Sequence, residues 1–406
     1  MNDDVFSPAD ILLPSGVDMA KWSVIACDQY SAQPDYWERV AKYVGESPST
    51  LKLILPEAYL DGDTEAMISG VRAAMRDYAT GGLFDEVGDS FIYIERDMSG
   101  GGVRRGLIGA VDLEQYSYTG AKAPVLASEG TTPEKLPARI AARRGAQLES
   151  PHVLAFIDDS GKTVLEPLAA RKDALPCLYD FELMEGGGRV TGMKVEGADA
   201  RAVSQALREL QATADPFIVI GDGNHSLASA KVCWDEIKGS LSAKDRQNHP
   251  ARRALLEINN VYDESIIFEA IHRVLFDVEP SEFIAAMEKS LPAGSDYTFG
   301  WHAGEQSGEV RISAGCVGDA LELFGGFLDG YLAGSGSRID YIHGDAAVLA
   351  LSKEEGRVGV IMPAIEKSQL FATVAKSGAF PKKSFSVGSS VDKRYYLECR
   401  SIHAHV

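Results

Sequence analysis

The feature that most constrains the fold is a buried strand that runs directly into a glycine-rich turn and then into a helix. Phe217-Ile-Val-Ile220 is a short, fully apolar run, which is typical of a buried strand. Gly221-Asp-Gly-Asn-His-Ser226 follows it, and the residues after Ser226 place apolar side chains at the three- and four-residue spacing of a helix. This strand–turn–helix unit predicts a mixed α/β (α+β) fold with mixed sheets.

Other apolar runs predict further strands. Trp22–Cys27 and Leu51–Leu55 are each short and apolar, and each is followed by polar residues or proline. Ala346–Met362 is expected to form an antiparallel hairpin in the C-terminal region. Arg394–Arg400 alternates strictly, which predicts a half-buried strand whose charged side chains largely face away from the core.

The chain is long enough for two or three domains, because it has 406 residues. We expect an N-terminal α/β segment over 1–130, a central segment with the glycine-rich motif over 131–275, and a C-terminal α+β segment over 276–406. A single compact body is the alternative.

Charge and cysteine content exclude several classes of protein. The formal net charge of -19 disfavours a nucleic-acid partner, since phosphate contacts need clustered Lys and Arg. The five cysteines are scattered and form no C-x-x-C pair, which argues against a disulfide framework or a cysteine zinc site. No apolar run is long enough to span a membrane, and the first residues lack the apolar core of a signal peptide. We therefore expect a cytoplasmic protein whose partner is a small polar or phosphorylated metabolite.

The glycine-rich motif has the properties of an anion site. Gly221 and Gly223 permit a positive φ and a close approach of the backbone to a ligand. The first turn of the following helix offers unpaired N–H groups and the positive end of the helix dipole, with Asn224 or Ser226 as its expected N-cap. A tight turn with a purely structural role is the alternative interpretation.

Acidic and imidazole side chains follow one another in the motif and recur in the chain. Asp222 and His225 of the motif bring a carboxylate and an imidazole to one edge, where proton transfer becomes possible. Glu149-Ser-Pro-His152 repeats the pairing, with Arg143 upstream as a guanidinium suited to phosphate. His272-Arg273 and His343-Gly-Asp345 each follow an apolar run. Structural ion pairs are the alternative for all of these.

A metal centre is a further possibility. Asp222, His225, His343 and Asp345 together would supply two imidazoles and two carboxylates. Their wide separation matches no H-x-x-x-H or H-E-x-x-H spacing, so no metal ligand is assigned.

Several ordered motifs resemble one known family. They are Gly221–Ser226, Trp22–Tyr30, Pro48–Leu51, Tyr341–Asp345 and Phe380-Pro-Lys-Lys-Ser-Phe385. Together they resemble the conserved bacterial and archaeal domain-of-unknown-function family "DUF ten-fifteen" from Asp10 to Ile402. The resemblance adds Asp28, Gln29, Lys383 and Ser384 to the candidate residues and implies no particular activity.

A second resemblance is local. G-D-G-x-H before a helix is similar to the phosphate-binding motif of the ParB and sulfiredoxin superfamily, which includes free-serine kinases and nucleotide-hydrolysing partition proteins. Those proteins usually carry Arg directly after the His, where this chain has Ser226. Lys231 or Arg273 would have to replace that phosphate clamp.

These observations favour a small-molecule enzyme that binds a nucleotide or phosphorylated metabolite, as a phosphotransferase or phosphohydrolase. Asp222 or Glu149 would act as the base and His225 as a polariser, while Arg143 and Lys383 would hold the anion and Mg²⁺ would accompany the nucleotide. A metabolite-binding regulator without turnover and a metal-dependent hydrolase are the alternatives. The catalytic candidates are Asp222, His225, Glu149 and His152. The ligand-binding candidates are Gly221, Gly223, Asn224, Ser226, Asp28, Gln29, Arg143, His272, Arg273, His343, Asp345, Lys383 and Ser384.

The candidates are expected to converge. Asp28, Glu149, His152 and His343 should lie near Asp222, because each adjoins a short strand or a fixed turn, and the loops at one edge of a sheet gather together. The helix that starts near Ser226 should bind an anion, with Lys382, Lys383 and Lys393 nearby if their segment folds over the site.

Overall fold

The computed structural model describes residues 4–60, 62–131 and 136–403 and divides the chain into two compact units. Unit 1 comprises residues 1–127, 131–266 and 389–406, and unit 2 comprises 128–130 and 267–388. The three expected segments differ from this division, because the polypeptide returns from unit 2 to complete unit 1. Residues 131–266 and 389–406 therefore pack in the same unit, although unit 2 separates them in the sequence.

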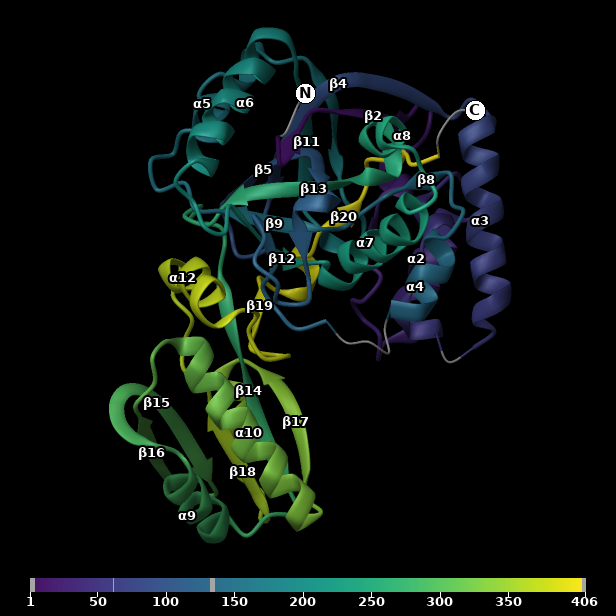
Figure 1. Cartoon of the computed structure of the whole chain (residues 1–406). Helices are drawn as coiled ribbons and strands as arrows, with labels where there is room; N and C mark the ends of the chain where they lie inside the picture. The colour runs from purple at the N-terminus through teal and green to yellow at the C-terminus, as the bar shows by residue number, and fades with distance from the viewer. Residues whose placement is uncertain (1–3, 61, 132–135, 404–406) are drawn as a thin grey trace. The chain divides into compact units, whose positions relative to one another are not determined.

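Unit 1 is built on a mixed sheet, to which the described residues contribute eleven strands (Figure 1). Three pairs are parallel, β12–β7, β13–β9 and β6–β7, and the other pairs are antiparallel. The order is β10 (Cys177–Glu182), β11 (Arg189–Val195), β4 (Phe84–Asp97), β5 (Val103–Asp112), β13 (Arg253–Asn260), β9 (Leu154–Ile157), β12 (Ile218–Asp222), β7 (Val125–Ala127) and β6 (Tyr116–Ser117), with β1 (Phe6–Ser7) on β5 and β2 (Ala9–Pro14) on β4.

Helices and two small sheets complete unit 1. The amphipathic pattern of each longer helix turns its apolar side chains inward; on α7, for example, Leu227, Ala230 and Trp234 are buried. The helices are α1 (Met19–Trp22), α2 (Pro34–Val44), α3 (Thr64–Thr80), α4 (Leu136–Arg143), α5 (Glu166–Ala169), α6 (Gly197–Gln211), α7 (Asn224–Lys238) and α8 (Ala243–Asn248). The small sheets pair β3 (Val24–Ile25) with β20 (Tyr395–Tyr396) and β8 (Leu148–Glu149) with β21 (Arg400–Ser401).

Unit 2 is an antiparallel sheet with its own helices. Its core is apolar and includes Phe283, Phe299, Phe324 and Val360. The strands are β14 (Phe268–Phe276), β15 (Ala293–Ala303), β16 (Gln306–Ile312), β17 (Arg338–His343), β18 (Arg357–Ile361) and β19 (Phe385–Val387), and the helices are α9 (Pro280–Ser290), α10 (Val317–Ser335), α11 (Asp345–Leu351) and α12 (Lys367–Ser377). The mixed α/β fold class predicted from the sequence is therefore confirmed.

Two strand predictions were wrong. Residues 50–53 form a 3₁₀ helix, since Ser49 caps it by accepting the N–H of Leu51. Ala346–Leu351 lies in helix α11, so the hairpin predicted over Ala346–Met362 does not form and only its second half is a strand, β18. A short apolar run does not separate a buried strand from a helix by its pattern alone, and here Val348 is buried while Leu349 is exposed, as on a helix.

The prediction for Arg394–Arg400 was half right. The segment forms two short strands, β20 and β21, and its alternating apolar side chains are buried. Its charged side chains Arg394, Glu398 and Arg400 are also buried, contrary to the expectation. Arg394 Nε lies 2.9 Å from Glu257 Oε2 and Arg394 Nη2 lies 2.5 Å from Glu398 Oε2, so charge pairing replaces solvation.

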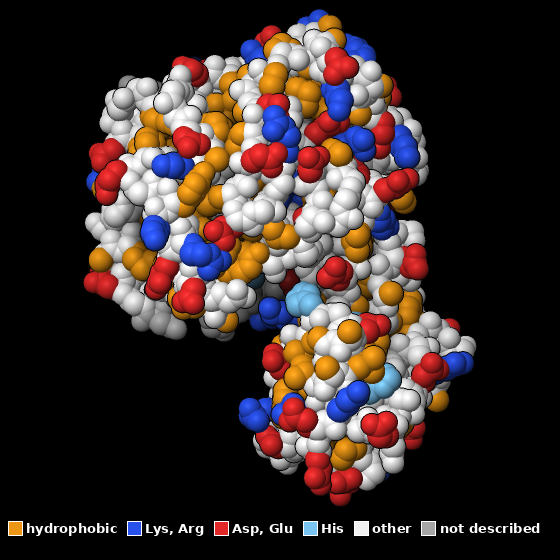
Figure 2. All heavy atoms as spheres, turned by 180° about the vertical axis from the view of Figure 1, so that it is seen from behind, with side chains coloured by type: hydrophobic (Ala, Val, Ile, Leu, Met, Phe, Trp, Pro, Cys, Tyr) orange, Lys and Arg blue, Asp and Glu red, His pale blue; other side chains and the backbone are white. Residues whose placement is uncertain are grey.

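The surface mixes charges of both signs. On the face shown in Figure 2, acidic side chains lie among basic ones over the described residues. That face therefore lacks the continuous basic surface that binds nucleic-acid phosphates.

Candidate active site

The glycine-rich turn joins β12 to α7, and both of its glycines are required by their surroundings. A Cβ on Gly221 would lie 2.2 Å from the ring of Phe156. Gly223 has φ +76°, and a Cβ there would lie 2.9 Å from Val153 Cα. The chain can therefore leave the strand and enter the helix only with glycine at these two positions.

Gly223 is the N-cap of α7, in place of the expected Asn224 or Ser226. The helix has no side-chain cap, and its first backbone hydrogen bond runs from Leu227 N–H to the Gly223 carbonyl. The expected cap was wrong because the left-handed glycine starts the helix one residue before Asn224. First-turn N–H groups, including those of Asn224 and Ser226, therefore have no acceptor within the helix.

Asp222 lies beside this helix end without capping it. Its Oδ1 accepts the N–H of Gly223 at 2.9 Å, and its Oδ2 lies 3.5 Å from the Nζ of Lys393. Both side chains are largely shielded, with 17% of Asp222 and 11% of Lys393 exposed. The Lys393 ammonium group therefore lies next to the motif, and the Asp222 carboxylate does not cap the first turn of α7.

Lys393 is placed by a buried arginine. Arg96 donates to the carbonyls of Val391, Asp392 and Lys393, the last at 2.6 Å, and Arg104 also donates to the Asp392 carbonyl at 2.9 Å. These bonds fix the backbone that carries Lys393. The sequence indicated Lys393 as a neighbour of the site, but nothing in the pattern pointed to Arg96.

His152 is the most unusual side chain near the motif. It is buried, with 2% exposed, and neither ring nitrogen has a hydrogen-bond partner. Its ring meets Tyr396 edge-on, with centroids 5.1 Å apart. Burial lowers the pKa of His152 below its ordinary value, and the negative charges of Asp28 and Asp222 only partly oppose that effect. His152 is therefore a neutral imidazole at pH 7 with both nitrogens unused.

Asp28 lies in the turn after β3 and interacts electrostatically with this imidazole. The Gln29 amide donates to its Oδ1 at 3.1 Å. Burial alone would raise the pKa of Asp28, but His152, Gln29, Lys393 and Arg139 outweigh burial and lower the pKa to about 2. Asp28 is thus a carboxylate at neutral pH, and Asp28, His152 and Asp222 form one electrostatic group.

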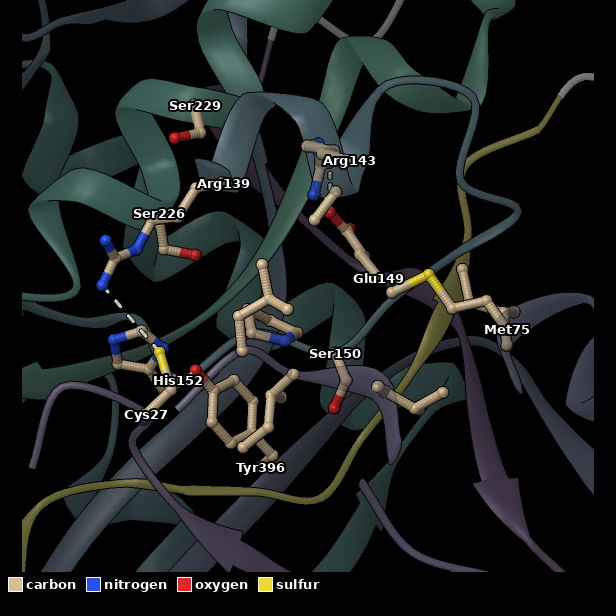
Figure 3. Close-up of a pocket in the computed structure, with 16 residues that line it drawn as sticks. Cys27, Met75, Arg139, Arg143, Glu149, Ser150, His152, Ser226, Ser229 and Tyr396 are labelled. Carbon is tan, nitrogen blue, oxygen red and sulfur yellow. Dashed lines mark hydrogen bonds and ion pairs between the residues drawn. The ribbon is translucent and has the colours of Figure 1, made fainter. Parts of the chain in front are cut away.

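A cavity of about 110 Å³ adjoins this group (Figure 3). His152 and Ser226 border it, and α4 packs beside α7 to form one wall. The remaining lining residues are Cys27, Leu53, Ile54, Leu55, Met75, Arg139, Ala142, Arg143, Leu148, Glu149, Ser150, Pro151, Ser229 and Tyr396.

Glu149 and Arg143 line the cavity but are bound to each other. Arg143 Nη2 lies 2.5 Å from Glu149 Oε2, and Arg400 and the Leu255 N–H bind the other carboxylate oxygen. Burial alone would raise the pKa of Glu149, but the two arginines lower it. This saturated carboxylate is unsuited to the predicted role of base, and the Arg143 guanidinium is not available as a separate anion clamp.

The other motif residues are placed as follows. His225 is partly exposed in the first turn of α7, where its carbonyl accepts the Ser229 hydroxyl at 2.8 Å, whereas Asn224 is buried. Lys231, a possible substitute for the missing arginine, lies 2.9 Å from Asp235 one turn along the helix. Lys393 is instead the cation next to the motif.

The remaining predicted residues belong to unit 2. His272 Nδ1 accepts the Met362 N–H at 3.0 Å, so Nε2 carries the hydrogen and lies 2.9 Å from Asp345 Oδ1. Arg273 donates to the Ile271 carbonyl and stacks on Tyr341. His343 and Lys383 are exposed, and the buried Ser384 donates to the Pro381 carbonyl. The approach of His343 to Asp222 stays a prediction.

No group of three or more His, Cys, Asp or Glu side chains in the described part of the chain is arranged to hold a metal ion. The four residues of the suggested metal centre are divided between unit 1 (Asp222, His225) and unit 2 (His343, Asp345).

Comparison with known proteins identifies the family. Residues 12–379 match the family described as "Protein of unknown function (DUF1015)". The chain belongs to the DUF1015 family. The resemblance stated from the ordered motifs is therefore confirmed for this DUF1015 protein, and no curated protein matches it.

Solved structures with similarity to the DUF1015 chain include a free serine kinase in complex with AMP, at 12% identity and a TM-score of 0.39, covering 71% of this chain and 90% of that one. SbnI with C-terminal truncation from Staphylococcus aureus has 10% identity and a TM-score of 0.38, covering 69% and 82%. A conserved hypothetical protein from Pyrococcus furiosus has 13% identity and a TM-score of 0.34, covering 71% and 90%.

None of the described helices is both long and apolar enough to cross a membrane.

Proposed function

We propose that unit 1 is a phosphoryl-transfer enzyme that binds a nucleotide or another phosphorylated small molecule at the start of α7. The observation that carries the proposal is one group of features: the N-terminus of α7, which has no side-chain cap, with Lys393, Asp222, Asp28 and the unpartnered, buried His152. Hydrogen-bond donors, a cation, two carboxylates and a neutral imidazole are the components that phosphoryl transfer uses.

The phosphate site is supported by three properties of the turn. Gly223 lets the backbone approach a ligand, and first-turn N–H groups of α7 have no helical acceptor. The helix dipole contributes roughly 0.3–1 kcal/mol for a nearby anion. Lys393 supplies a positive charge beside Asp222 of the same turn.

The two carboxylates would hold Mg²⁺ together with the phosphate oxygens. Mg²⁺ commonly binds one or two protein carboxylates and completes its coordination with phosphates and water. Asp28 and Asp222 both act on His152, so they lie within one electrostatic group. When bound, the ion would neutralise charge on the phosphates; Asp28 and Asp222 would orient it, and His225 would polarise the ligand from the helix end.

Equilibrium binding of ATP, ADP and inorganic phosphate tests this function. We expect wild type to bind ATP with Mg²⁺ in the micromolar to millimolar range, and Gly223→Ala to bind at least tenfold more weakly, because a Cβ there meets Val153. Gly197→Ala is the matched control: Gly197 begins α6 with φ +58° and has open space around it. This control should bind as wild type does. No binding by wild type at millimolar nucleotide, with and without Mg²⁺, would remove the proposal.

A further inference from the structure

The cavity beside His152 is lined by both polar and apolar side chains. The polar groups include the unused imidazole of His152 and the hydroxyls of Ser226 and Tyr396, with Ser226 directed into the space (Figure 3). Met75 lies away from His152, near the ion-paired Arg143 and Glu149 (Figure 3), and it belongs to the same apolar cluster as Leu53 and Leu148, which also line the cavity. A ligand that fits must therefore combine an aliphatic body with a polar group.

The charges of the cavity are already balanced. Arg139 Nη2 lies 2.5 Å from Glu57, and Arg143 Nη2 lies 2.5 Å from Glu149. Each guanidinium that borders the space is thus neutralised by a buried or largely shielded carboxylate. An anionic ligand would find no unpaired cation there, and a cationic ligand would find no unpaired carboxylate.

We infer that this cavity holds the phosphoryl acceptor, and that the acceptor is a small aliphatic alcohol with no net charge. The inference rests on the proposed function, because the alcohol would receive the phosphoryl group of a nucleoside triphosphate bound at the start of α7. His152 lines the cavity together with Ser226 of the first turn of α7, so the cavity adjoins the start of that helix. His152 is the group that can remove the hydroxyl proton.

The transfer forms one bond and breaks one bond at the γ-phosphorus. The alcohol oxygen forms a bond to the γ-phosphorus as its O–H bond breaks, and the proton passes to a ring nitrogen of His152. The bond between the γ-phosphorus and the bridging oxygen breaks, and its electron pair leaves with the nucleoside diphosphate. Neither ring nitrogen of His152 has a hydrogen-bond partner, so the nitrogen without a hydrogen is available to accept the proton.

A panel of acceptors tests the inference. Release of nucleoside diphosphate from MgATP is measured with short neutral alcohols and diols and with hydroxy acids of equal length, and ³¹P NMR identifies the phosphomonoester. We expect a neutral alcohol to raise the rate at least tenfold and the hydroxy acids to have little effect. Calorimetry of the same alcohols without nucleotide measures their binding to the cavity independently.

Two variants of α4 localise the acceptor. Ala142→Met extends a side chain into the cavity, so the KM for the alcohol should rise at least tenfold. Ala141→Met, one residue earlier on the same helix and outside the lining, is the matched control and should leave this KM unchanged. His152→Gln should lower kcat for alcohol phosphorylation and remove its acidic pH limb, which a purely structural role would not do.

The outcomes separate the two proposals. If wild type binds and hydrolyses nucleotide but neither binds nor phosphorylates any neutral alcohol, or prefers the hydroxy acids, the acceptor inference is overturned while phosphoryl transfer stands. If nucleotide does not bind, the proposed phosphoryl transfer fails. The calorimetric result alone then decides whether the cavity binds neutral alcohols. Equal KM values for Ala142→Met and Ala141→Met would also overturn the inference.

Discussion

His152 is the residue whose surroundings differ most from those of an ordinary surface histidine. Proteins bury few polar atoms without partners, and each such atom costs free energy. Here both nitrogens of one ring lack partners beside a cavity. An acid and an imidazole at Glu149–His152 could be predicted from the sequence. The sequence could not show that Glu149 is ion-paired while His152 has no partner. That difference depends on Arg143 and Arg400, which bind Glu149, and Arg400 lies 251 residues away in the sequence.

The stability of the protein should depend on His152 at mildly acidic pH. Its pKa is lower in the folded than in the unfolded state, so the unfolded state binds the proton first as the pH falls below about 6.5. The contribution of His152 to stability is therefore present above that pH and is lost as the pH falls toward the folded-state pKa, by at most about 1.4 kcal/mol per pH unit. Urea unfolding of wild type and His152→Gln at pH 7, 6 and 5 measures this. Parallel pH dependences in the two proteins would contradict it.

Lys393 should contribute to phosphate binding rather than to folding. We expect Lys393→Gln to weaken nucleotide binding about tenfold, since it removes the cation beside Asp222. Lys231→Gln is the control, because Lys231 pairs with Asp235 along α7. Titration calorimetry of both variants gives the comparison, and equal nucleotide affinities would show that Lys393 does not face the phosphate.

At the scale of the elements, the site depends on a segment that has little secondary structure. Residues 391–393 are held by side chains, chiefly Arg96 and Arg104 from the β4–β5 hairpin. The hairpin itself could be predicted from the strands around Met98–Gly102, and the structure has it. Its use as a clamp could not, because a buried arginine that donates to carbonyl groups leaves no periodic pattern in the sequence.

Removing the clamp should loosen the site and the fold together. Arg96→Met leaves the carbonyls of Gly187, Val391 and Lys393 without this donor, and a buried unsatisfied group costs roughly 1–3 kcal/mol. We expect unfolding at lower urea and weaker nucleotide binding. Arg189→Met, which removes an arginine from the surface of β11, should change neither. An unchanged urea midpoint for Arg96→Met would refute the clamp.

At the scale of the whole molecule, the division into units could not be read from composition, because no linker-like stretch marks it. Unit 1 is discontinuous, and residues 389–406 supply it with buried Arg394, Glu398 and Arg400. The strict alternation at 394–400 predicted a strand and correctly predicted its buried apolar side. It predicted the wrong environment for the charged side, since partners such as Glu257 lie more than a hundred residues away.

A chain that stops at Gly388 should therefore lose unit 1 selectively. Glu257 and Glu149 would keep their burial without Arg394 and Arg400, and removing one partner of a buried pair costs roughly 3–5 kcal/mol. Hydrogen exchange followed by mass spectrometry should show loss of protection in β12, β13 and α7. Protection should remain in β14, β15 and α10, because these elements belong to unit 2 and bury their apolar side chains in its core. Retained protection in β13 would contradict this expectation.

The return of the chain to unit 1 also sets an order of events during synthesis. Every residue of unit 2 is translated before Lys393 and Arg394 leave the ribosome. Until then, unit 1 contains the glycine-rich turn, Asp28 and His152, but it lacks the cation beside Asp222 and one of the two arginines that pair with Glu257. The nascent protein therefore cannot bring together a complete group of site residues while translation is under way, and a ribosome stalled within unit 2 would display a chain whose larger unit is unfinished.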